Sequence, residues 1–81
     1  MDVYTELVTM DWSERELSEI KLIIEYMSAS LNIAYGVTLV LDINQEKVLF
    51  CRNGKIIKSI SISSDNARGV LCDITDNLDN L

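Results

Sequence analysis

The sequence predicts an α+β fold in which two helices cover a three-stranded antiparallel sheet, in the order helix, three-stranded meander, helix (αβββα). Apolar residues recur with helical spacing over 11–31, alternate with polar ones over 36–62, and return to helical spacing over 63–78. Two amphipathic helices on one face of a sheet form a stable two-layer sandwich. The 81 residues contain no proline and no linker-like segment, so we expect a single domain, 1–81.

The first ten residues allow two interpretations. Val3, Thr5 and Leu7 alternate with their neighbours, which predicts a short N-terminal strand. A helical turn that groups Val3, Leu7 and Met10 is the alternative. We favour the strand.

The first helix has the clearest signals. Ser13 and Glu16 have the spacing of a capping box, and the polar run SASLN followed by Gly36 is expected to end the helix. The helix is expected to be exposed to solvent mostly along Arg15, Glu19 and Glu25. Leu22, Ile23 and Tyr26 are expected to lie beside or beyond the buried stripe. That buried stripe is expected to comprise Leu17, Ile20, Ile24, Met27 and Leu31.

Three strands are expected at about 36–43, 47–52 and 55–62. The dipeptide Asn53-Gly54 is a strong signal for a tight turn between the last two. A two-residue turn would pair Phe50 with Ile57, whereas a three-residue turn with a bulge would pair it with Ile56. The inward positions are expected to be Val37, Leu39, Leu41, Ile43, Val48, Phe50, Ile60 and Ile62.

Some apolar residues are left over on the other face of the sheet. Val40, Leu49 and one of Ile56 or Ile57 fall there whichever register is adopted. A sheet covered on one face only should alternate more cleanly, so these positions indicate a second contact surface.

The last helix is expected to be capped by Ser64 or Asp65. Gly69 inside it costs about 1 kcal/mol relative to alanine and is interpreted as permitting close approach to the sheet. The buried stripe is expected to comprise Ala67, Val70, Leu71, Ile74 and Leu78.

Charge is divided unevenly along the chain. The net charge is −6, and it is made of −5 over residues 1–25, +2 over 26–64 and −3 over 65–81. A field of this sign repels nucleic acid and anionic membranes and attracts basic partners.

The residue types in the chain argue against catalysis, cofactor binding and metal binding. The chain has no histidine, which excludes Ser-His and Cys-His nucleophiles, so we expect neither an enzyme nor a cofactor. Cys51 and Cys72 are expected to be reduced, small core residues, and two cysteines without histidine do not make a structural zinc site. The loop that begins at Asp42 departs from the calcium-binding pattern at Glu46 and Lys47. The acidic N-terminus lacks signal-peptide features, so we expect a cytoplasmic protein.

The basic hairpin from Lys47 to Lys58 is the one feature typical of nucleic-acid binding. The αβββα order is similar to that of the double-stranded-RNA-binding domain, but that family is basic at the start of its last helix, where this chain offers only Arg68. In order and acidity the chain is similar to some small phage-encoded inhibitors of host nucleases. That likeness of architecture and charge implies inhibition by protein binding, including an anti-defence role.

The C-terminal segment DITDNLDNL has three acids spaced by three residues, at Asp73, Asp76 and Asp79. They form either a displayed acidic face or a solvated tail. The tail is the favoured interpretation for this segment, because Asn77 and Asn80 add further groups that seek water. Display is supported by Leu78 and Leu81, which continue an apolar period.

We therefore expect a non-catalytic inhibitor or adaptor that presents an acidic helical face to a basic surface of another protein, plausibly one that binds nucleic acid. A homodimer or larger homo-oligomer paired through the sheet is one alternative, and a nucleic-acid binder that uses the basic hairpin is another. The residues expected to contact the partner are Glu14, Glu19, Glu25, Asp65, Asp73, Asp76 and Asp79.

Overall fold

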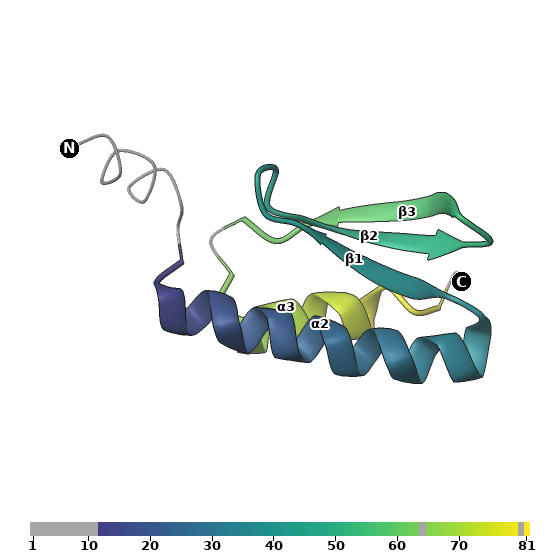
Figure 1. Ribbon diagram of the computed structural model, residues 1–81, viewed down its shortest axis with the longest axis horizontal. Coiled ribbons are helices and arrows are strands. Elements are labelled where there is room, and N and C mark those ends of the chain that lie inside the picture. The colour runs from purple at the N-terminus through teal and green to yellow at the C-terminus, as the bar shows by residue number, and fades with distance from the viewer. Residues whose placement is uncertain (1–11, 64, 80) are drawn as a thin grey trace.

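The helices and strands follow the predicted αβββα order, which confirms the fold class (Figure 1). The computed structural model describes residues 12–63, 65–79 and 81. The strand considered for the first ten residues lies outside this part of the chain. The elements are α2 Glu14–Tyr35, β1 Thr38–Asp42, β2 Lys47–Arg52, β3 Lys55–Ser61 and α3 Ala67–Asp76.

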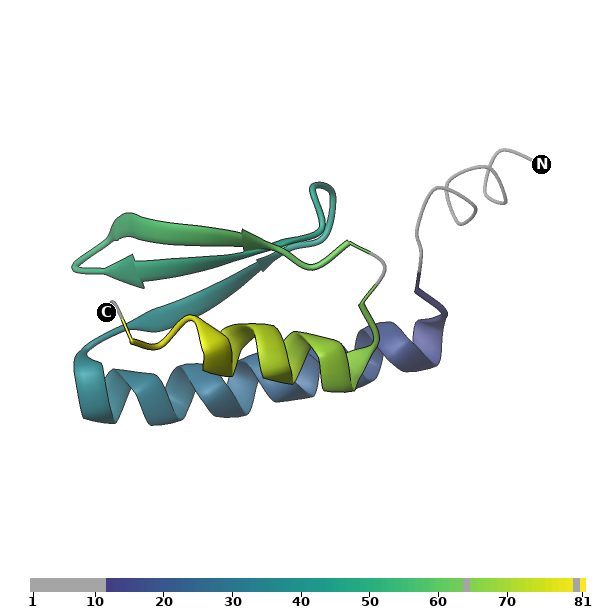
Figure 2. The same ribbon diagram turned by 180° about the vertical axis from the view of Figure 1, so that it is seen from behind.

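Both helices lie on the same side of the sheet and run side by side beneath it (Figures 1 and 2). The sheet is antiparallel with the order β1-β2-β3, so β2 is the central strand. No element among the described residues lies on the opposite side of the sheet. The arrangement is therefore a two-layer sandwich with one covered and one open sheet face.

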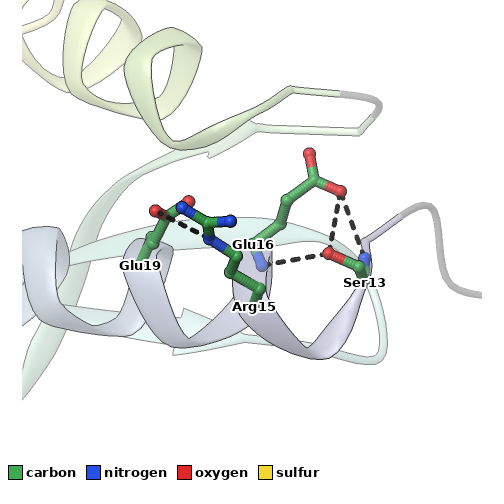
Figure 3. Close-up of polar contacts among 4 residues, drawn as sticks. All are labelled: Ser13, Arg15, Glu16 and Glu19. Carbon is green, nitrogen blue, oxygen red and sulfur yellow. Dashed lines mark hydrogen bonds and ion pairs between the residues drawn. The ribbon is translucent and has the colours of Figure 1, made fainter.

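The start of α2 has the predicted capping box (Figure 3). Glu16 N donates to Ser13 Oγ at 3.1 Å, and Ser13 N donates to Glu16 Oε1 at 3.2 Å, so two N–H groups that the helix leaves free are satisfied. At the other end the helix continues to Tyr35 and stops at Gly36, whose φ of 67° lies in the left-handed region. Glycine is favoured at this C-terminal cap because it has no Cβ that would clash with the backbone in the left-handed conformation.

The hydrophobic core fills the space between the helices and the inner face of the sheet. Val48 and Phe50 of the central strand are fully buried, as the alternation predicts. The apolar stripe of α2 is also confirmed, with Leu17 and Met27 packed at its border. The buried core residues are Trp12, Ile20, Ile24, Leu31, Val37, Leu39, Val48, Phe50, Ile62, Val70 and Ile74.

The register of the second hairpin differs from both predicted registers. Asn53 and Gly54 form the expected two-residue turn, both with positive φ, but Phe50 pairs with Lys58 because a bulge follows the turn. The bulge places Ile56 and Ile57 opposite a single residue of β2. Without the bulge, Ser59 and Ser61 would face the core, and Ile60 would face the opposite side of the sheet. The bulge therefore preserves apolar burial on the inner face.

The cap of α3 also differs from the prediction, which placed it at Ser64 or Asp65. Asn66 is the N-cap, and its Oδ1 accepts from Gly69 N at 2.8 Å. Asp65 instead belongs to the preceding turn, where its carbonyl oxygen accepts a hydrogen bond from Trp12 Nε1. A Cβ on Gly69 would lie 3.2 Å from the Asp65 carboxyl, so this glycine makes room for Asp65 and not for the sheet.

The C-terminal segment leaves the helix earlier than its apolar period predicts. α3 ends at Asp76, and Asn77 Nδ2 donates to Asp73 O at 2.8 Å. Leu78 and Leu81 nevertheless pack against the core, and Arg52 donates to Leu81 O at 3.4 Å. The segment is therefore held onto the body of the protein by its two leucines.

The corrected cap gives a prediction for stability. We expect Asn66→Ala to lower the free energy of unfolding by about 1 kcal/mol, because Gly69 N then loses its side-chain partner. Asn32→Ala, an exposed change on α2, is the matched control and should alter stability by less than about 0.5 kcal/mol. Urea unfolding measures both, and equal stability of the two variants would remove the assigned cap.

Candidate functional site

The outward side of α2 carries large apolar side chains. Leu22 is 53% exposed, Tyr26 72% and Ile33 88%. Their separations of four and seven residues place them on one stripe of the helix. Leu71 of α3, which was predicted to be buried, is 40% exposed. Arg15, Glu19 and Glu25 are exposed as predicted, and the large apolar residues lie among them on the solvated side of the helix.

A shallow groove separates α2 from the first turn of α3. Its volume is ≈ 560 Å³. The sequence did not predict the groove, because the groove depends on how the two helices lie relative to one another. The helical spacing of Leu22, Tyr26 and Ile33 beside the buried stripe was a signal that could have indicated an apolar outer surface. The groove is lined by Glu19, Leu22, Ile23, Tyr26, Asn66, Ala67 and Arg68.

The acids of α2 lie on two different sides of the helix. Glu14 and Glu25 are eleven residues apart, which is close to three full turns, so they share one flank of α2. This flank is on average about a third of a turn from the positions of α2 that line the groove. Glu19 lies on the groove side, where its Oε2 is 3.8 Å from Arg15 Nε (Figure 3). This ion pair is exposed and contributes little to stability.

The acids of α3 lie on the flank that faces away from α2. Asp73 is half-buried and Asp76 is exposed, and they lie about a third of a turn and half a turn, respectively, from the groove-lining Ala67. Asp79 is exposed but follows the helix end, so the spacing of three does not continue as one helical ladder. The predicted partner-binding acids therefore frame the apolar surface on both sides.

Asp65 and Asp73 are the two predicted site acids that the structure brings into contact. Burial, together with a hydrogen bond to Asp73 and its negative charge, raises the pKa of Asp65 from 3.8 to about 6. Asp65 Oδ2 is buried and has no hydrogen-bond partner, which also disfavours the charged form of this carboxyl group. Asp65 is thus a weaker source of negative charge in mild acid than an exposed aspartate.

Neither aspartate of the carboxyl pair lines the groove between α2 and α3. Within the described residues, no group of three or more cysteines and carboxylates is placed to hold a metal ion. The pair joins the turn before α3 to the second turn of that helix, which is a structural role.

The basic hairpin directs part of its charge toward the protein itself. Arg52 donates to Tyr35 O at 3.2 Å as well as to Leu81 O, and Lys58 Nζ donates to Asn77 O at 3.3 Å. These cations compensate carbonyl oxygens near the ends of the helices. Of the four hairpin bases, Lys47 and Lys55 are left for other contacts, which weakens the case for a phosphate-binding surface.

The open face of the sheet has exposed apolar residues, as the leftover positions predicted. Val40 is 48% and Ile56 62% exposed, and Ile57 is exposed as well. Both cysteines are free, but neither is in the core as expected: Cys51 is half-buried on β2 and Cys72 is exposed on α3. No helix among the described residues is sufficiently long and apolar to cross a bilayer.

The carboxyl pair makes stability depend on pH. The raised pKa means that the folded protein binds this proton more tightly than the unfolded chain does. The stabilisation is complete below about pH 3.8 and is lost as the pH rises through about 6. We expect Asp65→Asn to be more stable than the parent at pH 7–8 by on the order of 1 kcal/mol after allowance for screening, and no more stable near pH 4.

Urea unfolding at several pH values measures this difference. Asp76→Asn is the control, because it removes the same charge from an exposed position at the end of α3. A gain for Asp65→Asn that is the same at every pH, or that Asp76→Asn reproduces in full, would contradict the raised pKa of Asp65.

Comparisons of the chain with protein-family models, with curated proteins and with solved structures found no match. The surfaces described above are therefore the basis for a functional proposal.

Proposed function

We propose that the protein is a non-catalytic binding module that inhibits or adapts another protein by docking the outer side of its helical layer on a basic surface. The observation that supports this most is the exposed apolar stripe of Leu22, Tyr26 and Ile33, extended by Leu71 and framed by acids on both flanks. We name this surface the helical face.

An apolar centre with a polar border is the usual anatomy of a protein–protein interface. Tyr26, Leu22 and Ile23 are the large apolar residues that line the groove. Tyrosine is enriched among residues that dominate binding energy, because it buries a large area at a small entropic cost. A partner side chain inserted into the groove would therefore be the anchor of the complex.

The flanking acids favour a basic partner. Glu14 and Glu25 lie on one flank together with Lys21, and Asp73 and Asp76 lie on the other, so both flanks have a net negative charge. Acids around an apolar centre steer a cationic surface toward it and penalise anionic competitors. Proteins that bind nucleic acid present such surfaces, so occlusion of a nucleic-acid-binding groove is the inhibitory mode we favour. An anti-defence role against a nuclease would be one instance.

The proposed compartment is the cytoplasm, where Cys51 and the exposed Cys72 would remain reduced. The interaction would need neither a cofactor nor catalysis by this chain. The affinity would come from apolar burial in the groove, and the association rate and specificity would come from the acids.

Affinity capture from a native lysate followed by mass spectrometry tests the proposal. The immobilised parent chain should retain one or a few basic proteins. We expect Leu22→Ala combined with Tyr26→Ala to reduce their retention at least about tenfold, because it removes the walls of the groove. The matched control is Val40→Ala combined with Ile56→Ala, which removes similar apolar area from the open sheet face and should leave retention intact.

A charge variant separates the role of the acids from that of the groove. When Asp73, Asp76 and Asp79 are all changed to asparagine, binding to the captured protein should weaken and become less sensitive to salt, with stability unchanged or slightly raised. Retention that is indifferent to both the groove variant and the charge variant, or a preparation that retains nucleic acid and no protein, would contradict the proposal.

A further inference from the structure

The open face of the sheet carries a continuous apolar patch. Val40 of β1 pairs directly with Leu49 of β2, and Cys51 of β2 pairs with Ile56 of β3. Leu49 and Cys51 are two residues apart on one strand and therefore share a face, and the bulge adds Ile57. We name these five residues the sheet patch. No described element covers it (Figures 1 and 2).

The sheet patch is electrically neutral in a chain whose net charge is −6. Alternation along the strands places only Asp42 and Lys47 as charged residues on this face, and they are direct cross-strand partners. The remaining positions on the face are serines and a threonine. The helical face differs because acids frame it on both flanks.

We propose that the sheet patch binds a second copy of this chain, so that the protein forms a homodimer through the open faces of its sheets. Two copies of an acidic chain repel one another when their helical faces approach. The neutral patch is the large apolar surface on which that repulsion is smallest. A dimer formed there leaves both helical faces free for other partners, so this inference does not depend on the proposed function.

Pairing through the strand edges is less favourable than pairing through the face. Leu39 N, on the free edge of β1, already donates to Ser28 Oγ of α2 at 2.8 Å. On the other edge, antiparallel pairing of β3 with its own copy about its central residue would place Lys58 opposite Lys58. The face has neither obstacle, and two sheets packed face to face can bury it.

The size of the patch sets the strength of the dimer. Three strands about 4.8 Å apart and about 20 Å long give a contact on the order of 1,000 Å² in total when side-chain relief is included. That value is at the lower limit for a specific interface. We therefore expect a reversible dimer with a dissociation constant of about 10–500 μM, and not an obligate one.

Sedimentation equilibrium over about 5 μM to 1 mM of the full chain tests the proposal. The parent chain should show a monomer–dimer equilibrium, and Ile56→Lys should raise its dissociation constant at least about tenfold, because a charge would be buried without a partner. Ile33→Lys makes the same change on the helical face and should leave the constant unchanged. Both positions are exposed, so circular dichroism should report the parental fold for both variants.

Thiol reactivity supplies a second readout that needs no patch variant. In a Cys72→Ser chain, the iodoacetamide reaction rate of Cys51 should fall several-fold between low and high protein concentration, because the dimer covers it. In a Cys51→Ser chain, the rate of the exposed Cys72 should stay constant.

A strictly monomeric parent at about 1 mM would overturn the inference. So would a dimer weakened by Ile33→Lys and not by Ile56→Lys, or equal concentration dependence at both thiols. These outcomes leave the protein-binding proposal standing, and loss of partner capture in the groove variant leaves the dimer standing.

Discussion

One hydrophobic core, shared by the inner face of the sheet and both helices, is the packing on which the rest of the structure depends. Val48 and Phe50 of β2 are fully buried in it. The two described helices can cover only one face of a three-stranded sheet. Within the part of the chain that the structure describes, no element covers the opposite sheet face or the outward side of the helices. A small two-layer domain leaves apolar residues on such surfaces.

Local signals predicted most of the fold, and the differences arise where two parts of the chain meet. The capping box at Ser13 and the stop at Gly36 are local, and both were readable. The bulge at Ile57 was not, because it is set by the competition between a tight turn and burial of the later isoleucines. The cap of α3 moved to Asn66 because Asp65 is held in the preceding turn by contacts with Trp12 and Asp73.

The candidate site was predictable in its charge but not in its shape. Each of the seven acids is where a helix or turn was expected, yet periodicity along one helix does not tell how a second helix lies beside it. The groove at Leu22 and Tyr26, and the exposure of Leu71, depend on that placement. The result is a molecule with two apolar surfaces of different charge. An acid-framed surface suits a basic partner, and a neutral one suits a second copy of the same chain.

The central claim is that these two surfaces are separate and act independently. Amide chemical-shift mapping of the ¹⁵N-labelled chain tests it most directly, first by dilution and then by titration with the basic protein that the chain captures. Dilution should move resonances around Val40, Leu49 and Ile56, and titration should move those around Leu22, Tyr26 and Leu71, with little overlap. A single set of resonances that moves in both experiments, or a titration that moves only the sheet, would contradict the account.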